Sequence, residues 1–136
     1  MPVTFDVEDG VLALRMVGLY EPSDIRATLL AALDDPRGAS ARGLLFDVRA
    51  SESLSGRSIS EVRAMGRFLS KHVRRIGGHV ALLADADFAY GLMRLGSVVL
   101  EEEGSTVSVF RDETSARAWL LAPGGAGEGV DERSRE

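Results

Sequence analysis

The chain has 136 residues, of which 45% are hydrophobic and 27% charged, as expected for a globular protein with one buried core. Its formal net charge of −5 argues against general nucleic-acid binding, since such binding needs a positive surface that releases counterions. The absence of cysteine excludes disulfide and thiolate chemistry, and with only two histidines the common zinc-ligand spacings are missing too, so we expect no cofactor and no bound metal.

The N-terminal residues predict a β-hairpin. Two β-prone runs, residues 3–7 and 11–17, are separated by Glu-Asp-Gly, and Asp-Gly between such runs is a strong hairpin signal. Strand alternation places Leu12 and Leu14 together on the core face and directs Arg15 away from it.

A helix is predicted after this hairpin. Pro22 is tolerated in the first turn of a helix, and Ile25, Leu29 and Leu33 then recur on one helical face. The sequence Asp-Asp-Pro-Arg-Gly at residues 34–38 ends the helix.

The middle of the chain combines a buried strand with a well-marked helix start. Residues 43–49 are almost continuously apolar, as expected for a parallel strand that is covered on both faces. A serine-rich loop follows, after which Ser58 and Glu61 have the spacing of a capping box. In α/β proteins, function usually gathers where strands end and helices begin, so this loop is the strongest functional lead.

Two further strand–helix units complete the pattern. Residues 80–84 repeat the buried-strand signature, and Asp85 or Asp87 is predicted to cap a third helix. Residues 106–110 form a last strand, after which Asp112 is predicted to cap a final helix.

The predicted element order is β-β-α-β-α-β-α-β-α. It defines an α/β fold in which a β-hairpin start leads into alternating β-α units, with a mostly parallel sheet of four to five strands. We expect residues 1–122 to form a single domain and residues 123–136, Gly-rich and then charged, to be a disordered tail. Neither a secretory signal nor an apolar run of the ~20 residues that span a bilayer is visible, so we expect a cytoplasmic protein without a membrane span.

Several catalytic motifs are missing from this α/β pattern. The sequence contains no Gly-x-Gly-x-x-Gly after a strand, no Gly-x-x-x-x-Gly-Lys and no Gly-x-Ser-x-Gly. These absences remove the main signals for dinucleotide binding, phosphate-loop chemistry and a nucleophile elbow. We therefore expect a protein that is not an enzyme.

Several segments together resemble a known group of proteins. They are the opening hairpin, the strand that ends at Asp47 before a serine-rich loop, the block Asp-Phe-Ala-Tyr-Gly-Leu-Met-Arg at 87–94, and the stretch Val-Ser-Val-Phe-Arg-Asp-Glu-Thr-Ser-Ala-Arg-Ala-Trp-Leu at 107–120. They resemble the SpoIIAA-like superfamily, which includes the STAS domains of anti-sigma-factor antagonists, and are closer to the small bacterial STAS/SEC14-like proteins. The resemblance implies non-catalytic binding of a protein partner or of an apolar ligand.

The serine-rich loop is where the resemblance implies regulation. Anti-sigma-factor antagonists carry an Asp-Ser-Ser-Gly-Leu phosphoacceptor motif there, whereas this chain has Ser-Gly at 55–56 and Ser-Ile-Ser-Glu at 58–61. A phosphate at a helix N-terminus is electrostatically favourable and can switch a contact by its charge. We therefore expect a regulatory protein-interaction module of STAS type, with Ser55, Ser58 and Ser60 as partner-binding or switch candidates controlled by phosphorylation.

Asp47 and Arg49 are further candidates at the same strand end. An unpaired carboxylate is costly at the end of a buried strand, so Asp47 either pairs structurally with Arg49 or with loop amides, or serves a site. Ser58 has a structural alternative as well, that of a helix cap.

An alternative function is a carrier or sensor of a small apolar ligand. The third helix has a wide apolar face that includes Phe88, and Tyr90 and Arg94 lie one turn apart near its start. Aromatic and arginine side chains are enriched at interfaces, so these three residues are candidates for a ligand or partner surface; packing and a solvated arginine are the structural alternative. A homodimer is compatible with the sequence but is not specified by it.

Overall fold

The structure, a computed structural model, describes residues 2–122 as an α/β fold. Its elements are β1 (Val3–Glu8), β2 (Val11–Gly18), α1 (Pro22–Asp34), α2 (Pro36–Ala39), β3 (Leu44–Ser51), η1 (Leu54–Gly56), α3 (Ile59–Val73), η2 (Arg74–Ile76), β4 (His79–Leu83), α4 (Asp87–Glu102), β5 (Thr106–Phe110) and α5 (Glu113–Leu121). The predicted α/β class and the alternation of strands and helices are confirmed, with the short helix α2 as an unpredicted addition. The predicted tail, residues 123–136, lies outside the described residues.

The five strands form one sheet in the order β1-β2-β3-β4-β5. Strands β1 and β2 are antiparallel, and every other neighbouring pair is parallel. The hairpin turn has Asp9 at φ 53° and Gly10 at φ 81°, a left-handed backbone that Asp-Gly tolerates well. The predicted hairpin and the mostly parallel sheet are therefore confirmed.

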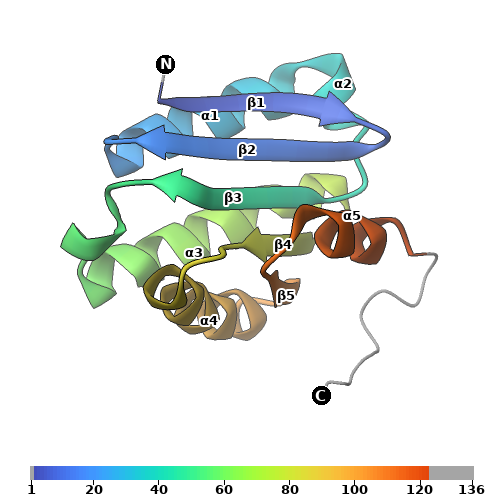
Figure 1. Ribbon diagram of the computed structural model, residues 1–136. Coiled ribbons are helices and arrows are strands. Elements are labelled where there is room, and N and C mark those ends of the chain that lie inside the picture. Colours follow the sequence, from blue (N-terminus) through green and yellow to red (C-terminus); the bar gives the residue numbers. More distant parts are fainter. Residues whose placement is uncertain (1, 123–136) are drawn as a thin grey trace.

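The sequential strand order places the crossover helices on a common face. Connections between parallel strands are almost always right-handed, so successive crossovers in one direction across the sheet fall on the same side. Helices α1, α3 and α4 cover that side, whereas α5 lies on the other, the near side in Figure 1. Among the described residues, three long helices therefore cover one face of the sheet and one helix covers the other.

The alternation within β3 shows why this strand reads as continuously apolar. Leu44, Phe46 and Val48 join the larger core beneath α1, α3 and α4, while Leu45 packs in the smaller core beneath α5. Asp47 is the polar exception, and it is buried as well. Both faces of β3 are covered, as the sequence predicts.

Helix starts agree with the prediction in two cases and differ in one. The Ser58 hydroxyl accepts from Glu61 N–H at 3.1 Å, while the Glu61 carboxylate accepts from Ser58 N–H at 2.8 Å, which confirms the capping box. Asp112 caps α5 by accepting from the N–H of Ser115 at 2.8 Å.

The predicted cap of α4 is wrong. Ala86 is the N-cap residue and makes no side-chain cap, while Asp87 is already the first helical residue. The carboxylate of Asp87 instead lies 3.2 Å from the guanidinium of Arg111 at the end of β5. Phe88, expected in the apolar face of this helix, is 62% exposed.

Candidate functional site

At the carboxyl end of the sheet, the loop after β2 is tied to the loop after β3. Tyr20 N–H donates to Ser53 Oγ at 3.0 Å, and Tyr20 Oη is 2.6 Å from Ser51 Oγ in a second hydrogen bond. The backbone adds a third tie, from Glu52 N–H to the carbonyl oxygen of Gly18 at 2.8 Å. These bonds hold the Tyr20 ring, largely buried, beside the start of α3.

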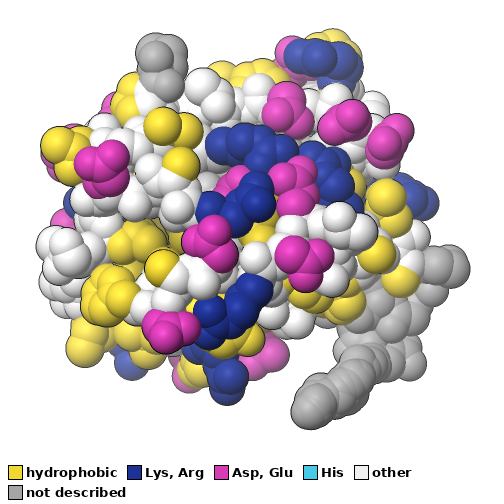
Figure 2. Space-filling view, viewed as in Figure 1, with side chains coloured by type: hydrophobic (Ala, Val, Ile, Leu, Met, Phe, Trp, Pro, Cys, Tyr) yellow, Lys and Arg dark blue, Asp and Glu magenta, His cyan; other side chains and the backbone are white. Residues whose placement is uncertain are grey.

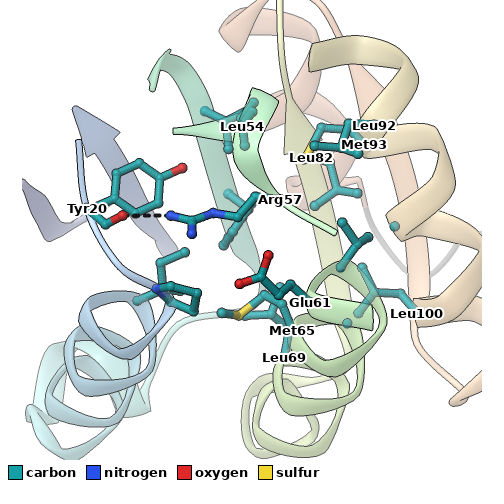
Figure 3. A pocket seen from close by; sticks show the side chains of 17 residues that line it. Tyr20, Leu54, Arg57, Glu61, Met65, Leu69, Leu82, Leu92, Met93 and Leu100 are labelled. Atoms are coloured by element: carbon teal, nitrogen blue, oxygen red, sulfur yellow. Dashed lines mark hydrogen bonds between the residues drawn. The ribbon is translucent and has the colours of Figure 1, made fainter. Parts of the chain in front are cut away.

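A pocket opens between these joined loops and helices α3 and α4, on the three-helix face of the sheet (Figure 3). Its cavity has a volume of about 80 Å³ and is open to solvent at its mouth. Its walls come from α1, β3, β4, α3, α4 and the two loops. The lining residues are Tyr20, Pro22, Ile25, Phe46, Val48, Leu54, Arg57, Glu61, Val62, Met65, Gly66, Leu69, Leu82, Leu92, Met93, Gly96 and Leu100.

Two glycines inside helices shape the wall between α3 and α4. A Cβ added to Gly66 would lie 2.8 Å from Val99 Cγ1, so the two helices pack closely because this residue has no side chain. A Cβ added to Gly96 would meet only Val62 Cγ1, at 3.9 Å, so space remains on that side. The glycines thus bring the helices together and leave the adjoining volume unfilled.

The polar groups of the pocket stand at its mouth. Arg57 Nη2 donates to the carbonyl oxygen of Tyr20 at 2.6 Å, the dashed line in Figure 3, and the guanidinium carbon lies 5.4 Å from the centroid of the Tyr20 ring. Glu61 contributes a carboxylate that also closes the capping box of α3. An apolar interior with a charged rim can hold an amphipathic small molecule.

The three candidate serines of the loop, Ser55, Ser58 and Ser60, lie in different surroundings. Ser58 is used as the helix cap, whereas Ser55 and Ser60 are exposed and their hydroxyls make no hydrogen bond within residues 2–122. Ile59, between Ser58 and Ser60, is 63% exposed. Phosphorylation of these serines stays a prediction.

Asp47 and Arg49 face away from the serines, toward α5 on the opposite side of the sheet. There they form, with Arg15, Glu113 and Arg117, what we call the arginine–carboxylate cluster, visible as adjoining blue and magenta side chains near the middle of Figure 2. Arg15 Nη1 is 2.6 Å from Asp47 Oδ2, and Arg49 binds both oxygens of that carboxylate at 2.9 and 3.0 Å. The pairing of Asp47 with Arg49 is the structural alternative that the sequence left open.

Glu113 joins the cluster to α5. It accepts from Arg15, from Arg49 and, one turn along the same helix, from Arg117 at 2.7 Å. Hydrogen bonds from Arg15 and Arg117 lower the pKa of Glu113 to about 2. Burial alone would raise the pKa of Asp47, but the hydrogen bonds and charges of Arg49 and Arg15 outweigh it and keep this pKa below its ordinary value. Both carboxylates are therefore charged at neutral pH. This suits ion pairs that hold α5 to β2 and β3 and does not suit proton transfer.

The candidates on α4 do not line the pocket. The guanidinium carbon of Arg111 lies over the ring of Tyr90, 4.1 Å from the ring centroid. Arg94 is exposed, as is Phe88. Their neighbours Leu92 and Met93 are the residues of this segment that reach the pocket.

The sequence did not point to several residues of the pocket and of the arginine–carboxylate cluster. Arg57 directly precedes the helix cap and belongs to no recognisable motif. Arg15 and Glu113 are 98 positions apart in the sequence and meet only in the folded chain. A signal did exist for Gly66 and Gly96, since a glycine inside a helical pattern often marks close packing.

Comparison with protein-family models and with curated proteins identifies no relative of the chain. The resemblance to the SpoIIAA-like superfamily therefore stays a prediction. Within residues 2–122, no helix is both long and apolar enough to cross a membrane, and no group of three or more His, Cys, Asp or Glu side chains could hold a metal ion.

Proposed function

We propose that this protein binds a small apolar or amphipathic molecule in the pocket beneath α3 and α4, as a carrier or sensor without catalytic activity. The observation that carries the proposal is the pocket itself, whose walls are mostly aliphatic, aromatic and methionine side chains. When an apolar ligand covers these walls and removes them from water, the free energy falls by roughly 25 cal/mol per Å² of apolar surface buried.

The position of the pocket supports the same proposal. It opens at the carboxyl ends of β3 and β4, the end of an α/β sheet at which ligands commonly bind. The hydrogen bonds that join Tyr20 with Ser51 and Ser53 hold one side of the mouth in place, so little ordering is needed on binding.

A pair of leucine substitutions on α4 tests the proposal. Gly96→Leu places a side chain in the pocket, whereas Gly91→Leu, on the same helix, extends into open space. The measurements are native mass spectrometry for co-purified small molecules and titration with Nile red, a neutral apolar dye. We expect binding by the wild type and by Gly91→Leu, and its loss in Gly96→Leu. Equal behaviour of all three proteins would contradict the proposal.

A second candidate is docking of a protein partner on the serine-rich loop. It is favoured by the exposure of Ile59, an isoleucine that lies between two of the candidate serines. Substitution of Ile59 by serine would weaken a partner complex while leaving Nile red binding unchanged, which separates this role from pocket binding.

A further inference from the structure

The pocket has one guanidinium among its lining residues, that of Arg57. Within residues 2–122, no carboxylate lies within 4.0 Å of this guanidinium, although six other arginines form ion pairs with residues far away in the sequence. Arg57 is therefore a half-buried cation at the edge of an apolar cavity, without an anionic partner from the described chain.

We infer that the ligand of this pocket carries an anionic head on an apolar body, and that Arg57 binds the head. The inference rests on the proposed function and names the class of ligand. A guanidinium has five N–H donors in a fixed planar arrangement, of which one is bound to Tyr20 here. The remaining donors match the two oxygens of a carboxylate, or those of a phosphate or sulfonate.

Arg57 is positioned for this role before any ligand arrives. The Tyr20 carbonyl and ring both hold the guanidinium, and Tyr20 is in turn fixed by Ser51 and Ser53. Little side-chain freedom remains to be lost on binding, which favours a tight contact between the head and the guanidinium.

Glu61 brings a negative charge to the pocket that also contains Arg57. Its carboxylate also lines the pocket, so it disfavours an anionic head and limits the affinity. Glutamine at this position keeps an oxygen for Ser58 N–H and thus preserves the capping box. Glu61→Gln should therefore strengthen the binding of an anion, whereas Arg57→Gln should weaken it.

The test uses decanoate, decanol and decylamine, which share a chain and differ in the charge of the head. Their affinities are measured by isothermal titration calorimetry with the wild type, Arg57→Gln, Glu61→Gln and Arg63→Gln, the last an exposed arginine of α3 outside the pocket. We expect decanoate to bind the wild type about tenfold more tightly than decanol, from charge-assisted hydrogen bonds. That preference should disappear in Arg57→Gln, increase in Glu61→Gln and persist in Arg63→Gln.

The outcomes separate the inference from the proposed function. If decanoate and decanol bind equally, or if decylamine binds best, the anionic-head inference is overturned while the pocket remains a binding site. If no probe binds any of these proteins, the proposed function fails and the inference fails with it.

Discussion

Asp47 is one buried carboxylate shared between two guanidinium groups. Its side chain is only 7% exposed, and it binds Arg15 and Arg49 while also accepting from the backbone N–H of Arg49 at 3.0 Å. A carboxylate removed from water in this way needs such partners, because an isolated buried charge costs several kcal/mol. These contacts explain why an acidic residue is accommodated in the middle of β3, between the apolar residues Phe46 and Val48.

Removal of this charge should destabilise the fold strongly. We expect Asp47→Asn to lower the free energy of unfolding by roughly 2–3 kcal/mol, since two arginines lose their shared carboxylate. Urea denaturation measures the change. Asp6→Asn is the matched control, because Asp6 is 55% exposed and lies 3.7 Å from the same Arg15. The control should cost less than about 0.5 kcal/mol, and equal losses in the two variants would contradict the structural role of Asp47.

Between elements, the contact of α3 with α4 is the one that defines the pocket. Gly66 faces Val99 directly, and the helices approach so closely that a Cβ would not fit without a shift. Glycine costs a helix about 1 kcal/mol relative to alanine, so its presence inside α3 indicates that close packing outweighs helix propensity.

Alanine substitutions at two helical glycines should therefore have opposite effects. Gly66→Ala is expected to lower stability by roughly 1 kcal/mol or more, because the added Cβ would lie 2.8 Å from Val99 Cγ1. Gly91→Ala, in open space on α4, should raise stability by up to about 1 kcal/mol. The cost of Gly66→Ala should shrink in a Val99→Ala background, as measured by a double-mutant cycle in urea. A stabilising Gly66→Ala would show that this contact does not limit the helix spacing.

Helices and strands are predicted well from the sequence because the patterns that mark them lie within a few neighbouring residues. The Ser58–Glu61 capping box needs residues only three positions apart, and the apolar run of β3 reflects burial on both of its faces. The predicted cap of α4 is wrong because Ala86 occupies the N-cap position, while the carboxylate of Asp87 pairs with Arg111, a residue distant in the sequence.

Across the whole molecule, the two faces of the sheet have different roles. The three-helix face contains the pocket, whereas the arginine–carboxylate cluster lies on the α5 face. Sequence alternation directs Arg15 away from the main core, but only the folded chain shows that α5 covers this second face and brings Glu113 to it. The pocket is likewise not encoded in any single segment, since its walls come from elements throughout residues 20–100.

The cluster joins β2, β3 and α5, so its titration should affect the stability of the whole fold. The pKa of Glu113 is about 2 in the folded protein and 4.5 ordinarily, so the folded state binds this proton less readily than the unfolded state. The resulting stabilisation is complete above pH 4.5 and is lost as the pH falls from 4.5 to about 2; the lowered pKa of Asp47 acts in the same direction.

Glu113→Gln should therefore be less stable than the wild type at neutral pH and should lose less stability on acidification through this range. Urea unfolding at a series of pH values measures both effects. Glu102→Gln, which removes an exposed carboxylate at the end of α4, controls for the loss of one charge and should follow the wild-type curve. If Glu113→Gln and the wild type lose stability in parallel between pH 4.5 and 2, the ion pairs of Glu113 do not hold α5 to the sheet, and the packing of Ala116 and Leu120 must do so alone.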